Sequence, residues 1–170
     1  MTRAILFAAL LLTASVQAVE IPEQCRVRNR GGRCVLSNCA TLGYRHRIAA
    51  LESLAPDRVI RGQEGPLDHE VRRILHGLGV TWEGRDHRSY DRTLLPLANS
   101  RGVVVSMKRG APWLWGKTLQ FNHSIILTRY DADGVSFYCP DNPQRIWRAG
   151  REWFSVWWMG NSMAFDSEER

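Results

Sequence analysis

Apolar residues recur at helical spacing in the first half of the chain. This spacing predicts a helix over residues 34–46, directly after a pair of glycines, and a shorter helical piece over residues 48–54. A third helix is predicted to open at Pro66 and to end at Gly79. Its apolar face consists of Leu67, Val71, Ile74, Leu75 and Leu78.

The second half of the chain changes to short apolar runs that are typical of β-strands. Strands are expected at residues 103–105, 123–130, 135–139, 145–148 and 155–165. The second and third runs are joined by Asp131-Ala132-Asp133-Gly134, a strong hairpin signal. Residues 90–99 are expected to form a short or bent helical element, because Pro96 would break a regular helix. Helices first and antiparallel strands afterwards predict an α+β domain.

The N-terminus has the layout of a secretory signal peptide. Arg3 supplies a basic start, residues 4–12 an apolar stretch, and Val16-Gln17-Ala18 a small-residue exit. The apolar stretch is too short to span a bilayer comfortably, since about 20 apolar residues are needed, and no later segment could cross a membrane. We therefore expect residues 1–18 to be removed and the protein to be secreted or periplasmic.

The rest of the chain has the size of one domain. Residues 19–165 are expected to form it, beginning with an extended entry over residues 19–27, and residues 166–170 to form a disordered polar tail. The formal charge of +6 falls to +5 when Arg3 leaves, which suits an anionic partner. Specific nucleic-acid binding is not expected, because the chain shows no zinc-finger spacing and no helix-turn-helix signal.

Four cysteines in an exported chain would ordinarily be paired. Cys34 and Cys39 are poor partners on one helix, because five residues place them roughly 140° apart around its axis. If Cys34 is free, Cys25 with Cys139 is the most plausible disulfide and Cys39 is a buried thiol; two disulfides remain the alternative. No Cys-x-x-Cys or His-x-x-x-His pair exists to chelate zinc, so no metal is expected.

Three residue types that can take part in catalysis follow one another along the chain in the order expected of a cysteine hydrolase. Cys34 would stand in the first turn of its helix, where the helix N-terminus and a nearby imidazolium lower a cysteine pKa. His123 begins a strand, and Asp141-Asn142 ends the partner strand. This order suggests a thiolate nucleophile, its general base and a group that orients the base.

The hairpin brings the proposed base and its orienting group together. If Tyr130 pairs with Val135, antiparallel register places His123 opposite Asn142, whereas one bulged residue would bring Asp141 there instead. Both alternatives are kept. Either group could accept the second imidazole N–H, but only the carboxylate would add charge stabilisation.

The tetrahedral intermediate also needs hydrogen-bond donors. The Cys34 backbone N–H is one candidate, and an upstream amide side chain is the other. Asn29 and Gln24 are the amides available, and Asn29 is the closer. The remaining histidines have no such neighbours and are interpreted as surface or packing residues: His46, His69, His76 and His87.

These residues resemble a known family. Residues 28–35, read as Arg-Asn-x-x-Gly-x-Cys-Val, resemble the active-site entry of small bacterial papain-like cysteine peptidases, relatives of the double-glycine leader peptidases. Leu-Gly-Val at 78–80, His-Ser-Ile-Ile-Leu at 123–127, Asp-Asn at 141–142 and a tryptophan-rich final strand follow in the same order. The resemblance implies a papain-like fold, with the cysteine at the head of a central helix that packs against a sheet.

The resemblance also implies roles for individual residues. By that likeness Cys34 is the nucleophile, His123 the base, Asp141 the orienting group and Asn29 the oxyanion donor. Asn29 departs from the family, because it replaces a glutamine and lies one residue nearer the cysteine. Trp113-Leu114-Trp115 is an aromatic insert and a candidate wall of a substrate cleft.

The sequence thus predicts an exported thiol hydrolase that cleaves an amide bond in a peptide or protein through an acyl-enzyme on Cys34. No metal or organic cofactor is implied. The same machinery would serve an amidase, a deamidase or a transglutaminase, because a thioester can be resolved by water or by an amine. The alternative from another class is a secreted, disulfide-stabilised, non-catalytic binding module on the same scaffold.

Overall fold

The computed structural model describes residues 18–30, 32–55, 68–85, 90–112, 116 and 118–166. The predicted signal peptide up to Gln17 lies outside this part of the chain, as do the tryptophan insert at 113–115 and the last four residues of the tail. Pro66, Leu67 and His87 also lie outside it.

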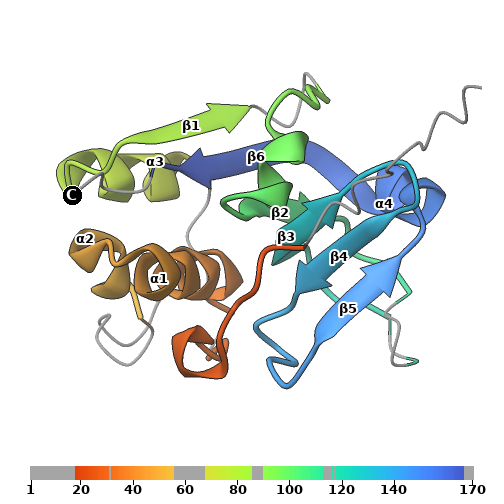
Figure 1. The fold of residues 1–170 in the computed structure, drawn as a ribbon, viewed down its shortest axis with the longest axis horizontal. Coiled ribbons are helices and arrows are strands. Elements are labelled where there is room, and N and C mark those ends of the chain that lie inside the picture. The colour runs from red at the N-terminus through yellow and green to blue at the C-terminus, as the bar shows by residue number, and fades with distance from the viewer. Residues whose placement is uncertain are drawn as a thin grey trace, which may run out of the picture.

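A six-stranded antiparallel sheet forms the centre of the molecule (Figure 1). Its strands are β1 (Trp82–Arg85), β2 (Val103–Met107), β3 (His123–Tyr130), β4 (Val135–Tyr138), β5 (Ile146–Ala149) and β6 (Trp158–Phe165). Their order is β1-β6-β2-β3-β4-β5, and every neighbouring pair is antiparallel. The predicted α+β class is confirmed, and the hairpin turn joins β3 to β4 as expected.

The helices precede and follow this sheet along the chain. They are η1 (Glu23–Cys25), α1 (Cys34–His46), α2 (Ala49–Glu52), α3 (Asp68–Gly77), η2 (Leu95–Asn99) and α4 (Arg151–Trp157). The bounds of α1 agree with the prediction, and η2 is the short element expected around Pro96. At the C-terminus of α1, Arg47 adopts the left-handed conformation with φ 60° and donates its N–H to the Gly43 carbonyl.

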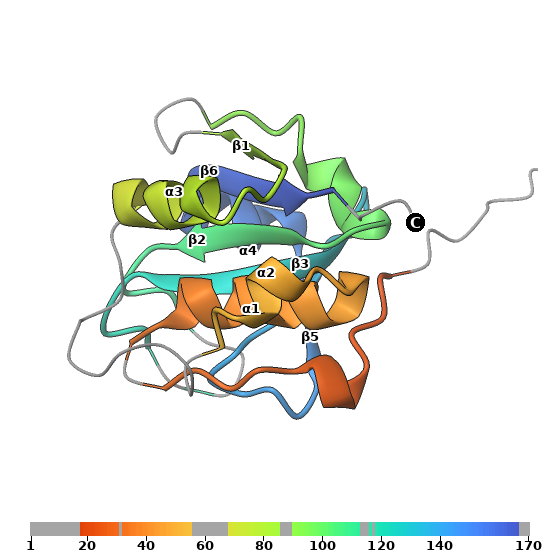
Figure 2. The same cartoon turned by 90° about the vertical axis from the view of Figure 1, so that its left-hand side faces the viewer.

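Two hydrophobic cores lie on opposite faces of the sheet. Figure 2 views the molecule from the side of α1, α2 and α3, with α4 behind the strands. On the near side Leu36, Cys39 and Leu42 of α1 are buried against Val104 and Ile126. On the far side Phe154 and Trp158 pack with the alternate positions of β2 and β3. Side chains alternate between the faces of a strand, so β2 and β3 contribute to both cores.

Gly43 allows α2 to pack closely against α1. A Cβ built at this position would lie 2.7 Å from the Leu51 Cβ and 2.7 Å from the Glu52 backbone nitrogen. Such distances are far inside van der Waals contact, so only glycine fits without a shift of α2. The fully buried Leu51 is thereby held under α1.

Three predicted elements differ from the observed ones. Residues 155–157 belong to α4 rather than to the last strand, because Phe154 and Trp158 are one helical turn apart and stack at 5.5 Å. The entry over residues 19–27 is not continuously extended, since η1 interrupts it. Leu78 lies just beyond α3 and is 36% exposed rather than part of the buried face.

Strand β1 was not predicted from the sequence. Its four residues, Trp-Glu-Gly-Arg, contain one large apolar side chain and lack a strand-like alternation of apolar and polar positions. The strand forms because β6 offers it an edge, with Trp82 opposite Phe165 and Arg85 opposite Ser162. A long-range partner therefore decides the conformation of this segment.

The predicted disulfide between Cys25 and Cys139 is not formed, and all four thiols are free. Cys25 packs against the core beneath α1, whereas Cys139 belongs to the core on the other face of the sheet. The sheet between the two cores keeps these sulfurs apart. Cys39 is the fully buried thiol that was expected.

Candidate active site

Cys34 is the first residue of α1, so its side chain stands at the positive end of a 13-residue helix. Gly32, with φ 75°, makes the turn that leads into the helix. The backbone N–H of Ser124 contacts the Cys34 thiol and favours its ionised form. The residue as a whole is largely buried, with 9% of its surface exposed.

A buried hydrogen bond fixes α1 against the start of β3. The Asn38 Nδ2 group, one helical turn beyond Cys34, donates to the Ser124 Oγ at 2.9 Å, and both side chains are fully buried. Because Ser124 follows His123 in the strand, this bond also sets how far the thiol lies from the imidazole. The helix N-terminus is thereby held beside the first residues of β3.

His123 and Asp141 meet at the open end of the β3–β4 hairpin. The His123 Nδ1 atom lies 3.6 Å from the Asp141 Oδ2 atom, with the imidazole buried and the carboxylate half-exposed. Of the two residues considered from the sequence, the structure brings Asp141 to the ring. The half-buried Asn142 instead donates its backbone N–H to the Cys139 carbonyl at 3.1 Å.

One extra residue within β3 produces this pairing. Tyr130 pairs with Val135 as predicted, but the register shifts between Leu127 and Arg129, so that Ile126 pairs with Tyr138. If the shifted register is extended to the end of the two strands, His123 lies opposite Asp141. The expected bulge is therefore present, although it lies at Thr128 and not in the turn. The Thr128 carbonyl accepts a hydrogen bond from the Val19 N–H at 2.7 Å.

A second thiol lies against the imidazole. The His123 Nε2 atom is 3.3 Å from the Cys139 Sγ atom. Cys139 is fully buried, and burial raises the pKa of its thiol to about 12. Sequence reasoning assigned this cysteine to a disulfide and missed its place beside the histidine. Cys139 lies three residues before Asn142, at the end of the same strand. This spacing was the available signal that the thiol lies near the histidine.

Cys34 and His123 are neighbours without a direct hydrogen bond. Among the described residues the Cys34 thiol contacts the Ser124 N–H, while the imidazole nitrogens face Asp141 and Cys139. Because Ser124 directly follows His123 in β3, the thiol lies beside the strand residue next to the one that carries the imidazole.

Burial governs the protonation of both groups. It raises the pKa of the Cys34 thiol, against the opposing effect of the Ser124 backbone N–H. It lowers the pKa of His123, against the opposing effect of the Asp141 carboxylate. Both shifts favour the neutral forms of the thiol and the imidazole.

Asn29 contacts the carboxylate. Its Nδ2 group donates to the Asp141 Oδ1 atom at 2.7 Å, and its backbone N–H donates to the Pro140 carbonyl at 2.8 Å. Three residues earlier in the same segment, the Arg26 guanidinium donates to the carbonyls of Pro143 and Gln144. Asn29, expected as an oxyanion donor, thus holds Asp141 in place, and the other amide candidate, Gln24, is exposed.

The remaining site expectations concern groups outside this cluster. His46 lies at the end of α1, where its Nε2 atom is 2.6 Å from the Arg101 carbonyl, in a packing role. Within the described residues, no group of three or more histidine, cysteine or acidic side chains is arranged to hold a metal ion. No helix in the same part of the chain has the length and apolar character needed to cross a membrane.

The helix headed by Cys34 and the antiparallel sheet that carries His123 and Asp141 belong to a fold that this chain shares with solved peptidase domains. Solved structures with this fold include a double-glycine motif protease from an AMS/PCAT transporter in complex with the leader peptide, at 14% identity and a TM-score of 0.55. The match covers 87% of this chain and 92% of that one.

A second similar structure is the peptidase domain of Streptococcus mutans ComA, at 14% identity and a TM-score of 0.53, covering 82% of this chain and 97% of that one. No protein-family model and no curated protein matches the sequence. The fold of this chain is therefore shared with double-glycine peptidase domains, the group that the sequence pattern resembles.

Proposed function

We propose that this protein is an exported cysteine hydrolase that cleaves an amide bond of a peptide through an acyl-enzyme on Cys34. The main support is that Cys34, the first residue of α1, contacts Ser124 at the start of β3, where Asp141 contacts the neighbouring His123. The fold it shares with a protease bound to a leader peptide makes an extended peptide the favoured substrate class. Export rests on the signal-peptide pattern of residues 1–18.

Exposure favours Cys34 over Cys139 as the nucleophile. A peptide carbonyl has to reach the sulfur, and Cys34 keeps 9% of its surface exposed while Cys139 is fully buried. The dipole of α1 and the Ser124 N–H both stabilise a thiolate at Cys34. Cys139 has a pKa of about 12, so its thiol stays protonated beside the imidazole.

The proposed reaction proceeds in two halves. His123 turns from Cys139 toward Cys34 and accepts the thiol proton, and the thiolate forms a bond to the peptide carbonyl carbon. The C–N bond then breaks, and the amine leaves with the proton from the imidazolium. Water, deprotonated by His123, attacks the thioester, and the Cys34 sulfur leaves and recovers its proton.

Two groups on the hairpin side support the base. The Asp141 carboxylate lies near Nδ1, where it stabilises the imidazolium formed in each half-reaction. Asn29 holds that carboxylate through its amide. The Cys34 backbone N–H, at the start of α1, is the proposed oxyanion donor.

Alkylation and hydrolysis of the mature protein test this proposal. Iodoacetamide followed by mass spectrometry is expected to modify Cys34 first, and Cys34→Ser is expected to abolish cleavage of a random peptide library. Cys25→Ser is the matched control, because Cys25 is a half-buried thiol remote from His123. Full hydrolysis by a folded Cys34→Ser variant would contradict the mechanism. Products that carry a transferred amine, or a side-chain deamidation, would identify a transferase or deamidase.

A further inference from the structure

A four-residue turn lies against the imidazole of His123. Residues 139–142, Cys-Pro-Asp-Asn, follow β4, and a backbone hydrogen bond of 3.1 Å joins the N–H of the asparagine to the carbonyl of the cysteine. Proline stands at the second position, which favours such turns. Asn29 anchors the turn, because its backbone N–H donates to the proline carbonyl at 2.8 Å and its amide donates to the aspartate at 2.7 Å. The cysteine and aspartate side chains are therefore held beside the ring.

Each ring nitrogen faces a side chain of this turn. The Nδ1 atom lies 3.6 Å from the Asp141 carboxylate, and the Nε2 atom lies 3.3 Å from the Cys139 sulfur. Burial lowers the pKa of His123 and so favours the neutral ring, which carries one N–H donor and one acceptor nitrogen. Because a carboxylate attracts an N–H and repels a lone pair, the proton belongs on Nδ1. The Nε2 atom is then the acceptor.

The Cys139 thiol is placed to donate its proton to this acceptor. The backbone N–H groups of Asp141 and Asn142 contact the sulfur, so its lone pairs already face donors. Burial raises the pKa of the thiol to about 12, which keeps the proton on the sulfur at neutral pH. A thiol is both a weak donor and a weak acceptor, and here the acceptor side is engaged. The S–H is therefore the group that fits the Nε2 atom.

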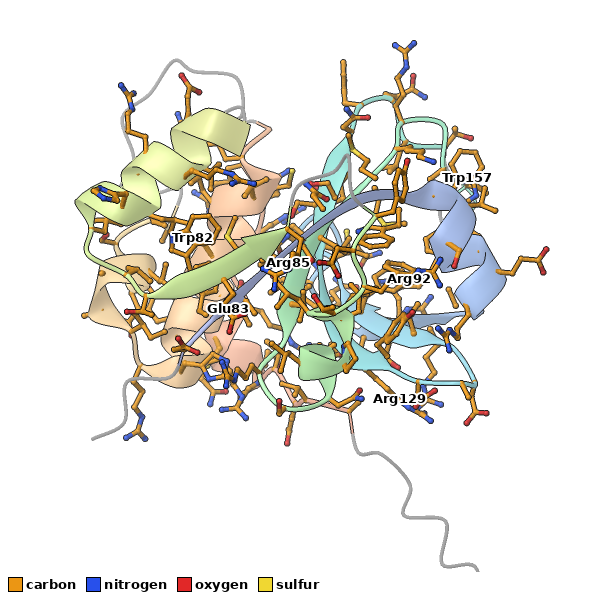
Figure 3. The ribbon with its side chains drawn as sticks, turned by 90° about the horizontal axis from the view of Figure 1, so that it is seen from above. Trp82, Glu83, Arg85, Arg92, Arg129 and Trp157 are labelled. Carbon is orange, nitrogen blue, oxygen red and sulfur yellow. The ribbon has the colours of Figure 1, made fainter. Side chains whose placement is uncertain are left out.

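The cations Arg129 and Lys108 are engaged away from the ring. Arg129 lies six residues further along β3, about 20 Å at 3.3 Å per residue, where it pairs with an acid of the hairpin turn (Figure 3). On β2 the residue paired with the histidine is the uncharged Met107, and the ammonium of Lys108 donates to a backbone carbonyl of α4 at 2.9 Å. On α1, burial raises the pKa of the Cys34 thiol and so favours its uncharged form. The Asp141 carboxylate, in contrast, acts on the ring directly.

We propose that Cys139 is a positioning residue, whose S–H donates to Nε2 of His123 and holds the ring as the Nδ1–H tautomer until the ring turns to Cys34. Because Nδ1 keeps its proton beside the carboxylate, Nε2 is the nitrogen that can accept the proton of the nucleophile. An imidazolium carries a hydrogen on Nε2 as well, which would meet the S–H donor, so Cys139 disfavours protonation of the ring before it turns. The catalytic consequence rests on the proposed function, but the tautomer can be measured without hydrolysis.

Nitrogen NMR of the ring is the first test, and it needs no change at Cys139. In isotope-labelled mature protein at pH 8, the ring signals of His123 are those that disappear in His123→Gln. They are expected to show a protonated Nδ1 and an unprotonated Nε2 that accepts a hydrogen bond. A ring protonated on Nε2 would overturn the proposal, because that nitrogen could not accept the S–H.

Replacement of the thiol tests the hydrogen bond itself. Cys139→Val fills the space without a donor, so the pKa of His123 in an NMR titration should rise by about 0.5 to 1 unit, the value of one hydrogen bond between uncharged groups. Cys139→Ser keeps a donor and should stay at the wild-type value. Cys39→Val is the matched control, because Cys39 is also fully buried with a pKa of about 12, but it lies in the core on the other face of the sheet. This control should leave the pKa of His123 unchanged.

An unchanged pKa in Cys139→Val, or an equal rise in Cys139→Ser, contradicts the donor role whether or not the protein hydrolyses peptides. The expected tautomer and pKa shift in a protein that cleaves nothing contradict only the proposed function. In the active protein, the acidic limb of the pH profile of kcat/KM should move to higher pH in Cys139→Val by the shift that NMR measures. An unmoved limb would show that Cys139 does not act through the base. Thermal unfolding of each variant establishes that the core remains intact.

Discussion

Two thiols lie near His123, Cys139 against its imidazole and Cys34 against the backbone N–H of the next residue, and they occupy different environments. Cys34 begins a helix after a glycine turn, at the edge of the core, where backbone N–H groups point toward its sulfur. Cys139 follows β4 and is enclosed in the core on the other face of the sheet. Contact with a histidine therefore does not by itself make a nucleophile, because substrate access and stabilisation of the thiolate are also needed.

Replacing each cysteine in turn should give the largest difference in kcat/KM between the two thiols. Cys34→Ala is expected to lower kcat/KM by at least about 10⁴-fold, since a nucleophile in a catalytic unit carries most of its effect. Cys139→Ala should change kcat/KM by less than about tenfold, and its cost should appear as a lower melting temperature through the small cavity left in the core. A reversed order of the two losses in peptide hydrolysis would make Cys139 the nucleophile.

The pH dependence of alkylation gives the next largest contrast. The ordinary pKa of 9.0 is raised to about 12 at Cys139, so at pH 8 its thiolate is roughly a thousandfold scarcer than that of an ordinary cysteine. The pKa of Cys34 is also raised, and its alkylation rate should climb with pH beyond the range of a free cysteine. In rates measured by mass spectrometry from pH 6 to 10, Cys34 should lead at every pH, and Cys139 should react only on unfolding.

Replacement of the carboxylate tests how the base is oriented. Asp141→Asn is expected to lower kcat by at least about 10²-fold, because the imidazolium loses its counter-charge and the ring loses its preferred tautomer. Asn142→Ala should stay within about twofold, since Asn142 contributes a backbone contact. Equal losses in steady-state kinetics would indicate that the side chain of Asn142 also supports the ring.

The smallest effect separates two roles for Asn29. As a positioning residue for Asp141, its replacement by alanine should lower kcat about tenfold, the value of one hydrogen bond to a charged group. As an oxyanion donor it would cost about 10²- to 10³-fold. Asn29→Ala should also move the acidic limb of the pH–rate profile, because the carboxylate that favours the imidazolium is displaced. Gln24→Ala is the control and should leave both quantities unchanged.

Burial of His123 carries a consequence for stability with pH. The folded protein lowers the pKa of this imidazole below its ordinary value of 6.5, so the unfolded chain binds the proton more readily. The stability that the neutral ring contributes is present above pH 6.5 and is lost as the pH falls through the lowered value. Urea unfolding at pH 7 and pH 5 should show a smaller pH effect in His123→Ala than in the wild type.

Local patterns in the sequence determined the elements that hold the main groups. The glycine pair and the apolar spacing placed the start of α1 at Cys34, and the Asp131 to Gly134 turn placed the hairpin that carries His123. These signals are short-range, because helix periodicity and turn chemistry depend on a few neighbouring residues.

Only the tertiary structure decided which side chains meet. A bulge at Thr128 selected Asp141 over Asn142, the fold directed Asn29 to that carboxylate, and β6 induced β1 at the edge of the sheet. Each of these outcomes depends on a contact between segments far apart in the chain. A shift of one residue in register exchanges the two faces of a strand. The stability of these contacts therefore depends on the assembled sheet and not on any local sequence pattern.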